Sequence, residues 1–251
     1  MLFNLLLACL PAETDETKDS ADDSGSTEEL TDAVCTEATE VPCEDEIISD
    51  FSLHDDKTAK GDIENTAAGS GWVSIVDATA GGSSAASKNA WIYAKFTEDG
   101  LEKVEIDDET ALQDMSWHIA ARRYIIRLNS GASGPSCVGA AKIRDEFDAV
   151  DAGDASELEY QLEDFYTESC ELKEDNSGMP GSPDTQLSTF WEYVGSCVGT
   201  TGQVWVLQLD SGELVKFTVD AYYANDGQEE CNSSGSTSEE GAMYTWRWAL
   251  L

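Results

Sequence analysis

The side chains of this sequence with the greatest chemical reactivity are seven cysteines and two histidines, spread over 251 residues. One cysteine lies in the pattern Gly195-Ser-Cys-Val-Gly199, which has the form of a nucleophile elbow. That motif requires a strand–turn–helix context and a histidine base, and the sequence around Cys197 indicates neither. With two histidines in the whole chain, general acid–base schemes have few candidate groups. The sequence therefore predicts that the protein is not an enzyme.

The cysteines are better explained as disulfide partners, because six of them follow Cys9 and the start of the chain indicates export. No Cys-x2-Cys pair is present, which argues against a structural zinc site. Six thiols allow many pairings, and the sequence alone does not select one. The six candidate disulfide cysteines are Cys35, Cys43, Cys137, Cys170, Cys197 and Cys231.

One pairing is predicted from geometry. The strands expected at 203–209 and 213–224 should fold back at Asp210-Ser-Gly212 and bring their outer ends together, where Cys197 and Cys231 lie. The other four cysteines would then form a short local loop and one longer pair: Cys35 with Cys43, and Cys137 with Cys170 by elimination.

The first residues resemble a bacterial lipoprotein signal. Leu6-Leu7-Ala8-Cys9 has the form of a lipobox, in which the cysteine becomes the acylated N-terminus. Only eight residues precede Cys9 and none is basic, so the natural start is expected upstream. The alternative is a frayed apolar N-terminus. We expect residues 1–9 to be the remnant of a signal and Cys9 to be the lipidation site.

The composition of the next segment and of the whole chain is strongly acidic. Residues 10–46 are rich in Asp, Glu, Ser and Thr, which predicts an acidic disordered tether. The chain has 51 acidic and 14 basic residues and a formal charge of −37. Such a surface repels phosphate groups, so nucleic acid is not an expected partner, and contact with a membrane is expected only through the N-terminal lipid.

The remaining residues, 47–251, predict one all-β domain of many short antiparallel strands with long loops and at most one or two short helices. The candidate helices are 155–165 and 184–193, and the Gly- and Ser-rich stretches 81–87 and 231–241 are expected to be surface loops. The strand at 115–128 is apolar on both faces, which predicts a central strand covered on both sides. Strands are expected at 47–53, 71–77, 90–97, 101–106, 115–128, 139–143, 203–209, 213–224 and 243–250.

Two blocks of the sequence carry a family resemblance. The first is an ordered series within residues 116–141: Trp117, Ala120, Arg123, Tyr124, Ile126, Arg127, Asn129, Ser130, Gly131, Ser133, Gly134, Gly139 and Ala140. The second is 203–223, followed by Tyr244-Thr-Trp-Arg-Trp248. Together they resemble the signature segment and closing strands of the HmuY-like haem-binding lipoproteins. His118 departs from the pattern, because it stands where that family usually has Asp.

The resemblance implies a HmuY-like all-β domain that captures or carries haem on the bacterial cell envelope. It implies haem as the cofactor and no metal beyond the haem iron. A lipid anchor in the outer membrane or on the cell surface is expected, and an outer-membrane receptor is a further expected partner. The alternative is a non-catalytic surface lipoprotein that uses the same scaffold to bind another ligand or a protein, with the haem ligands lost.

Members of that family are known to hold haem iron between two side chains, His in some and Met in others. His118 is the best candidate axial ligand, and His54 and Met115 are the other candidates. If the histidines are not ligands, Met179 and Met243 are next. The alternative for His118 is a strand histidine bonded to a carboxylate. The resemblance also makes three arginines candidates for contact with the haem propionates, with structural salt bridges as the alternative: Arg122, Arg123 and Arg127.

Overall fold

The computed structural model describes residues 33–79 and 88–251 of the chain. In these residues the chain is mostly antiparallel strand, with short helices between strands, so the predicted all-β class is confirmed. The strands are β1 (Ile63–Ala68), β2 (Gly71–Asp77), β3 (Ile92–Thr97), β4 (Gly100–Val104), β5 (Ile119–Arg122), β6 (Ile125–Leu128), β7 (Gly139–Ile143), β8 (Trp191–Val194), β9 (Cys197–Thr200), β10 (Val204–Gln208), β11 (Leu214–Tyr223) and β12 (Gly241–Leu250). The helices are α1 (Glu44–Asp50), α2 (Ala152–Ala155) and α3 (Gly227–Ser234), with single 3-10 turns at Thr110–Leu112, Phe147–Ala149 and Ser188–Phe190.

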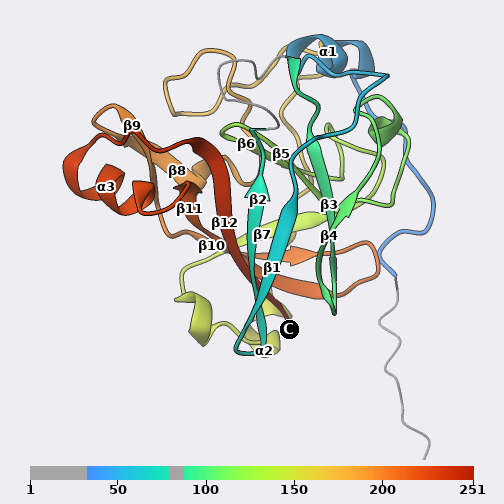
Figure 1. The fold of residues 1–251 in the computed structure, drawn as a ribbon. Helices are drawn as coiled ribbons and strands as arrows, with labels where there is room; N and C mark the ends of the chain where they lie inside the picture. Colours follow the sequence, from blue (N-terminus) through green and yellow to red (C-terminus); the bar gives the residue numbers. More distant parts are fainter. Residues whose placement is uncertain (1–32, 80–87) are drawn as a thin grey trace, which may run out of the picture. The chain divides into compact units, whose positions relative to one another are not determined.

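Two sheets make up most of the domain (Figure 1). The larger sheet has the order β1-β2-β12-β11-β10-β7, and the smaller one has the order β4-β3-β5-β6. A side chain joins them: Asn65 of β1 donates to the carbonyl of Leu101 in β4 and accepts from its N–H, each at 3.0 Å. The Asn65 side-chain amide thus makes the pair of hydrogen bonds that a neighbouring strand backbone would make, and so connects the two sheets. The pair β8-β9 forms a third, two-stranded sheet.

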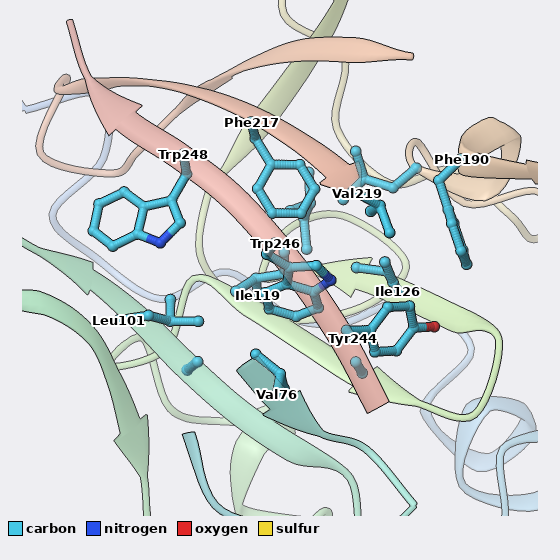
Figure 2. Packing of buried hydrophobic residues seen from close by; sticks show 14 of the residues in the cluster. Val76, Leu101, Ile119, Ile126, Phe190, Phe217, Val219, Tyr244, Trp246 and Trp248 are labelled. Atoms are coloured by element: carbon cyan, nitrogen blue, oxygen red, sulfur yellow. The ribbon is translucent and has the colours of Figure 1, made fainter. Parts of the chain in front are cut away.

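The main core lies between the two sheets (Figure 2). The strand β12 shows why, because its side chains alternate between buried and partly exposed along the chain. Tyr244, Trp246 and Trp248 point inward from β12 toward Ile119 and Ile126 of the smaller sheet. Trp246 and Trp248 both pack their ring edges against neighbouring aromatic rings, the arrangement that aromatic quadrupoles favour.

A second core covers the other face of the smaller sheet. It joins Tyr93 of β3 and Ala120 of β5 with side chains from distant segments, including Phe51, Trp117 and Phe165. The smaller sheet is therefore buried on both faces, as predicted from the two-sided apolar pattern of the signature segment. A third and smaller cluster, which includes Val206 and Phe147, covers part of the outer face of the larger sheet.

The prediction of one strand at 115–128 is wrong, because the chain reverses at Arg123 and Tyr124 to form the hairpin of β5 and β6. Arg123 adopts φ of 53°, which allows the tight reversal. The reversal changes which side chains share a face: Ala120 pairs with Arg127 across the hairpin. The sequence hid this turn because Arg-Tyr contains none of the residues that usually favour φ above zero.

The prediction of a strand at 47–53 is also wrong, since residues Glu44–Asp50 form α1. Ile47 and Phe51 lie four residues apart and are both buried, which is helical spacing. Three acidic residues occupy the first turn, where the helix dipole favours negative charge.

Part of the segment expected to be a tether packs on the domain instead. The backbone N–H of Thr39 donates to the carbonyl of Pro135 at 2.8 Å, and Val41 is 5% exposed. Two disulfides hold this segment, so residues 33–46 belong to the folded domain. Residues 10–32 of the expected tether, and the expected signal remnant at 1–9 with Cys9, lie outside the described residues.

The predictions of two helices, at 155–165 and 184–193, are wrong as well. Helix α2 ends at Ala155, where the expected helix at 155–165 would begin, and the expected helix at 184–193 is a single 3-10 turn followed by β8. The expected loop at 231–241 begins inside helix α3. Strands β1, β8 and β9 were not predicted, because polar and small residues dilute their alternation.

The disulfides confirm one predicted pair and correct two. Cys197 is bonded to Cys231, at the ends of the β10–β11 hairpin as predicted. The other pairs are Cys35 with Cys137 and Cys43 with Cys170. The predicted local Cys35–Cys43 loop is wrong because the segment between them lies against the domain surface, where each cysteine meets a distant partner.

Candidate functional site

His118 lies directly before β5 and is 8% exposed. Its Nδ1 accepts a hydrogen bond from the backbone N–H of Phe96 at 3.1 Å, and its Nε2 lies 3.3 Å from Oδ1 of Asp210. The hydrogen bond from His118 lowers the pKa of the Asp210 carboxyl. Both ring nitrogens are therefore engaged inside the fold, which is the arrangement of a histidine that fixes the β10–β11 turn through a carboxylate.

The two histidines lie on different faces of the smaller sheet. The His118 ring stacks on Phe96 of the main core, with ring centroids 6.2 Å apart. His54 lies beside the second core instead. Its backbone N–H donates to Oδ2 of Asp108 at 3.1 Å, and its carbonyl accepts from the backbone N–H of Asp108 at 2.9 Å. The Nε2 atom of His54 is buried and has no hydrogen-bond partner among the described residues. Met115 is partly buried in the segment that leads into β5.

Arg127 is fully buried and is surrounded by aromatic rings. Its guanidinium carbon lies 4.7 Å from the ring centroid of Trp91 and 5.1 Å from that of Trp117. It donates to the carbonyl of Ser133 at 2.6 Å and to the Tyr93 hydroxyl at 2.7 Å. An arginine with these partners serves the second core, because it has no exposed surface to offer a ligand.

A buried carboxylate faces Arg127 across Tyr93. The Tyr93 hydroxyl lies 3.2 Å from Oδ1 of Asp108, and that oxygen also accepts the backbone N–H of Trp91 at 2.9 Å. Burial raises the pKa of the Asp108 carboxyl, while the nearby guanidinium groups act in the opposite direction. Arg127 and Asp108 are therefore the charged ends of a buried hydrogen-bond network, with the neutral Tyr93 hydroxyl between them.

The other two arginines lie close to the end of the β5–β6 hairpin. Arg122 is 8% exposed and donates to the backbone carbonyls of Phe51, Ser52 and Asn89. Burial lowers its pKa to about 10, which leaves it charged at neutral pH. Arg123 is exposed at the hairpin tip, with its guanidinium 5.3 Å from the ring centroid of Tyr124. Of the three candidate arginines, Arg123 is thus the one whose charge is open to a ligand.

Aromatic side chains surround the hairpin tip. Tyr124 packs on Trp191 of β8 with ring centroids 5.6 Å apart, and Trp191 packs on Tyr193 at 5.1 Å. Trp191 is buried, Tyr124 is partly buried and Tyr193 is 47% exposed. The row Tyr124–Trp191–Tyr193, which we call the aromatic row, therefore runs from the main core to the surface.

Two cavities adjoin the aromatic row. The smaller, of about 180 Å³, lies at the hairpin tip and is lined by Phe51, Arg122, Arg123, Tyr124 and Gly181 among others, with the carboxylate of Asp50 at its side. The larger, of about 440 Å³, is lined by Trp191, Tyr193 and a set of carboxylate and hydroxyl residues. We call them the arginine cavity and the carboxylate cavity. Their linings differ in charge, although the ring contact of Tyr124 with Trp191 connects them.

Met179 lies in the turn between the two cavities. It is partly buried against the main core, and its neighbours in sequence line the carboxylate cavity at Ser177 and the arginine cavity at Gly181. Met243 is partly buried near the start of β12, far along the sequence from this turn. The structure thus places Arg123 and Tyr124 together at the arginine cavity. Met179 and His54 each lie two residues from its lining, at Gly181 and Ser52, whereas His118 packs against Phe96 in the main core.

Sequence reasoning missed Trp191 and Tyr193, which were assigned to a weak helix. The alternation of Trp191, Tyr193 and the glycine at 195 was the available signal for a short strand that ends in a turn. Glu163 was missed too: it is 2% exposed and accepts the backbone N–H groups of Leu128 and Gln186 at 2.9 Å each. The sequence contains no signal for its burial, since the surrounding segment is acidic and polar.

Cys197 lies in the elbow-like pattern, but its sulfur is bonded to Cys231 and therefore supplies no thiolate nucleophile. Within the described residues, no helix is both long and apolar enough to span a bilayer.

The fold and the site define a disulfide-bonded all-β domain whose hairpin tip presents aromatic rings and a basic side chain. A family profile described as HmuY protein matches residues 87–234, a region that contains the hairpin tip and the aromatic row. The chain belongs to the HmuY family. A comparison with curated proteins finds no match.

Three solved structures are similar to this chain at low sequence identity. A candidate HmuY-like haem-binding protein from Bacteroides vulgatus has 16% identity and a TM-score of 0.42, and the match covers 71% of this chain and 91% of that one. A candidate lipoprotein from Bacteroides fragilis has 13% identity and a TM-score of 0.41, with coverage of 73% and 90%. The apo HmuY analogue of Tannerella forsythia has 12% identity and a TM-score of 0.32, with coverage of 77% and 99%.

Proposed function

We propose that this protein captures or carries haem as a lipid-anchored protein of the bacterial cell envelope. The observation that carries the proposal is membership of the HmuY family, over a region that includes the hairpin tip. The sequence resembles haem-binding lipoproteins of that family, and an exported haem carrier has no need of catalytic residues.

The arginine cavity is the place we propose for haem. Haem supplies an iron that takes an axial sulfur or nitrogen ligand, an apolar ring and two carboxylates. Arg123 offers an exposed positive charge for a carboxylate, Tyr124 offers a ring face, and Met179 lies in the adjacent turn as a thioether donor. The residues present therefore fit the chemistry of haem.

The size of this cavity sets a condition. At about 180 Å³ it is smaller than the roughly 300–1,000 Å³ of pockets that enclose a small molecule. We propose that the turn around Met179 moves away from the hairpin when haem binds. Gly178 and Gly181 adopt φ of 81° and 75° in this turn, and their conformational freedom supports such a movement.

Among the candidate ligands, we propose Met179 ahead of His118, His54 and Met115. His118 would have to give up its hydrogen bonds to Phe96 and Asp210 before either nitrogen could bind iron. The Met179 side chain gives up only apolar contacts, because a thioether is a weak hydrogen-bond acceptor. Movement of its turn also breaks backbone hydrogen bonds, such as that from the N–H of Ser182 to the carbonyl of Met179 at 3.1 Å.

A titration of ferric haem into the full chain tests the proposal. We expect one equivalent to bind with a sharp Soret band, and Met179→Ala to shift the band and weaken binding. Met243→Ala is the matched control, because it removes an equally flexible thioether from β12. Arg123→Ala should weaken binding without moving the Soret maximum. Loss of the band in His118→Ala alone, with the fold intact by circular dichroism, would return the axial position to His118. The absence of a Soret band in the wild type would contradict haem binding.

Anchoring is proposed from the lipobox at Cys9, and an outer-membrane receptor is the proposed protein partner. Mass spectrometry of native protein should find an acylated cysteine at the mature N-terminus. An unmodified Met1 in native material would contradict this part of the proposal.

The second candidate function is a non-catalytic lipoprotein that binds another ligand on the same scaffold. The carboxylate cavity favours it, because this larger space is unsuited to an anionic ligand such as haem.

A further inference from the structure

The carboxylate cavity combines an exposed aromatic ring with acidic side chains. Its lining includes Trp191 and Tyr193 of the aromatic row and three acidic residues, Asp175, Asp184 and Glu192. Asn176 and several Ser and Thr residues complete the lining. Its volume of about 440 Å³ lies within the usual range of small-molecule pockets.

The charge in this cavity has one sign. The described residues that line it include no Lys, Arg or His. Asp175 is held inside the fold, because its carboxylate accepts hydrogen bonds from Ser177 and Ser182. Asp184 and Glu192 are exposed at the cavity, and Asp184 accepts one hydrogen bond from Ser188 at 3.0 Å. All three carboxylates therefore contribute negative potential to the space, and those of Asp184 and Glu192 are the more accessible.

The two aromatic rings form a corner. The planes of Trp191 and Tyr193 meet at 87°, with ring centroids 5.1 Å apart. Buried Trp191 is fixed by its contacts with Tyr124 and Phe190, so the corner has a rigid wall. Tyr193 keeps 47% of its surface exposed whereas Trp191 keeps 5%, so the Tyr193 ring is the one that a ligand in the cavity can reach.

We propose that the carboxylate cavity binds an organic cation with an alkylammonium head group. Aromatic faces attract such a cation through the ring quadrupole, and carboxylates next to the rings add long-range attraction. An anionic ligand would be repelled, and a neutral ligand would gain nothing from the carboxylates. A bare metal ion is not favoured here, because the described acidic residues of this cavity do not bring three ligand atoms close enough together to hold one.

This proposal does not depend on haem binding. The haem proposal uses Arg123 and Met179, whereas the cation proposal uses Tyr193, Asp184 and Glu192. The two sites are connected by the contact between Tyr124 and Trp191 and by the turn around Met179, which lines the carboxylate cavity at Ser177 and the arginine cavity at Gly181. Arg123 lies outside that turn, so Arg123→Ala should leave cation binding unaltered.

The experiment is a titration of the full chain with choline. Binding is monitored through tryptophan fluorescence or nuclear magnetic resonance. The matched control ligand is the neutral carbon analogue of choline, in which a tert-butyl group replaces the trimethylammonium group. We expect saturable binding of choline, weakened by added salt, and at least about tenfold weaker binding of the neutral analogue. Equal binding of the two ligands, or no saturable binding of choline, would overturn the proposal.

Variants locate the site. Tyr193→Ala should weaken choline binding by about two- to thirtyfold, and Tyr193→Phe should keep it, because the ring face remains. Glu192→Gln should weaken binding and reduce its dependence on salt. Leu162→Ala is the control for loss of an exposed apolar side chain, since Leu162 is 45% exposed and lies outside this cavity. Choline binding that is unchanged in both Tyr193→Ala and Glu192→Gln would overturn the assignment. Haem titration of the same variants should give the wild-type result, which separates this proposal from the first.

Discussion

The two cores on either side of the smaller sheet are stabilised in different ways. The main core is formed by regular strands from both sheets, with Trp246, Trp248 and Phe217 at its centre. The second core brings together chain segments that are far apart in the sequence and encloses Arg127 and Asp108. Two disulfides, Cys35–Cys137 and Cys43–Cys170, fasten the N-terminal segment, and Cys43 packs against this core.

The difference shows where covalent bonds and buried charge replace strand pairing. A sheet supplies partners for every backbone group and repeats its apolar positions, so it can form an apolar core without further links. The second core draws on loops and on one short helix, and these gain little from local hydrogen bonds. In the second core, disulfides and the buried network of Arg127, Tyr93 and Asp108 supply the stability and specificity that strand pairing supplies in the main core.

The largest effect is expected from Arg127→Met. Removing the guanidinium leaves the Asp108 carboxylate buried with less compensating charge and takes a donor from Tyr93 and from Ser133. The free energy of unfolding should fall by about 3 to 5 kcal/mol, measured by urea denaturation. Arg123→Met is the control, since Arg123 is exposed, and it should have little effect. Adding Asp108→Asn to Arg127→Met should recover part of the loss. A variant Arg127→Met as stable as the wild type would show that the charge is dispensable.

The next effect is expected from replacing Cys43 and Cys170 together by serine. The bond spans 127 residues of sequence, so its loss frees a long loop in the unfolded chain, and a decrease of about 2 to 4 kcal/mol is expected. Replacing Cys197 and Cys231 in the same way is the comparison, because that bond spans 34 residues. Hydrogen exchange should show faster opening of α1 in the first variant and of α3 in the second. Uniform loss of protection in both would contradict the local role of each bond.

A pH effect is expected from Glu163, which lies between β6 and the segment before β8. Burial raises the pKa of Glu163 to about 7 from a normal 4.5. The folded state therefore binds this proton more tightly than the unfolded state, and the contribution to stability falls as pH rises from about 4.5 to about 7. The effect should amount to roughly 3 kcal/mol. In Glu163→Gln this decline should disappear, which urea denaturation across that pH range would show. An identical pH dependence in the two proteins would rule out Glu163 as its source.

The smallest effect is expected in the main core, from Ser74→Ala. The Ser74 hydroxyl accepts from the Trp248 indole at 2.8 Å and donates to Asn65 at 2.7 Å, so it links β12 to β1 through neutral groups. Its loss should lower the free energy of unfolding by about 2 kcal/mol, because two neutral hydrogen bonds are removed and the buried Trp248 N–H loses its partner. Thr66→Ala, an exposed change on β1, is the control. A loss as large as that of Arg127→Met would remove the contrast between the two cores.

The sequence predicted the regular strands of the larger sheet better than the turn and the helix that contribute to the second core. Strands β2 and β7 have the bounds that the alternation predicted, and β10, β11 and β12 differ by a residue or two, because an inward-outward pattern is visible locally. The pattern at 115–128 was read correctly as covered on both sides, but its turn at Arg123 was not visible. Helix α1 was mistaken for a strand because Ile47, Ile48 and Phe51 fit both periods in so short a segment.

The candidate site was predicted in part. The sequence pointed to the region around Arg123, and the structure adds the rings of Trp191 and Tyr193 from β8. The proposed ligand position at His118 cannot be judged from sequence, because the partners of its two nitrogens, Phe96 and Asp210, come from other strands and turns.

The sequence by itself determined the all-β class, the strands with clear alternation and the Cys197–Cys231 bond, since each depends on order within a short stretch. Only the tertiary structure decided that Cys35 and Cys43 bond to distant partners, that Arg127 is enclosed while Arg123 is open to solvent, and that two cavities of different charge adjoin one aromatic row. The physical reason is that burial and pairing across about a hundred residues depend on how the whole chain closes, and periodicity along the chain records only which face a residue prefers.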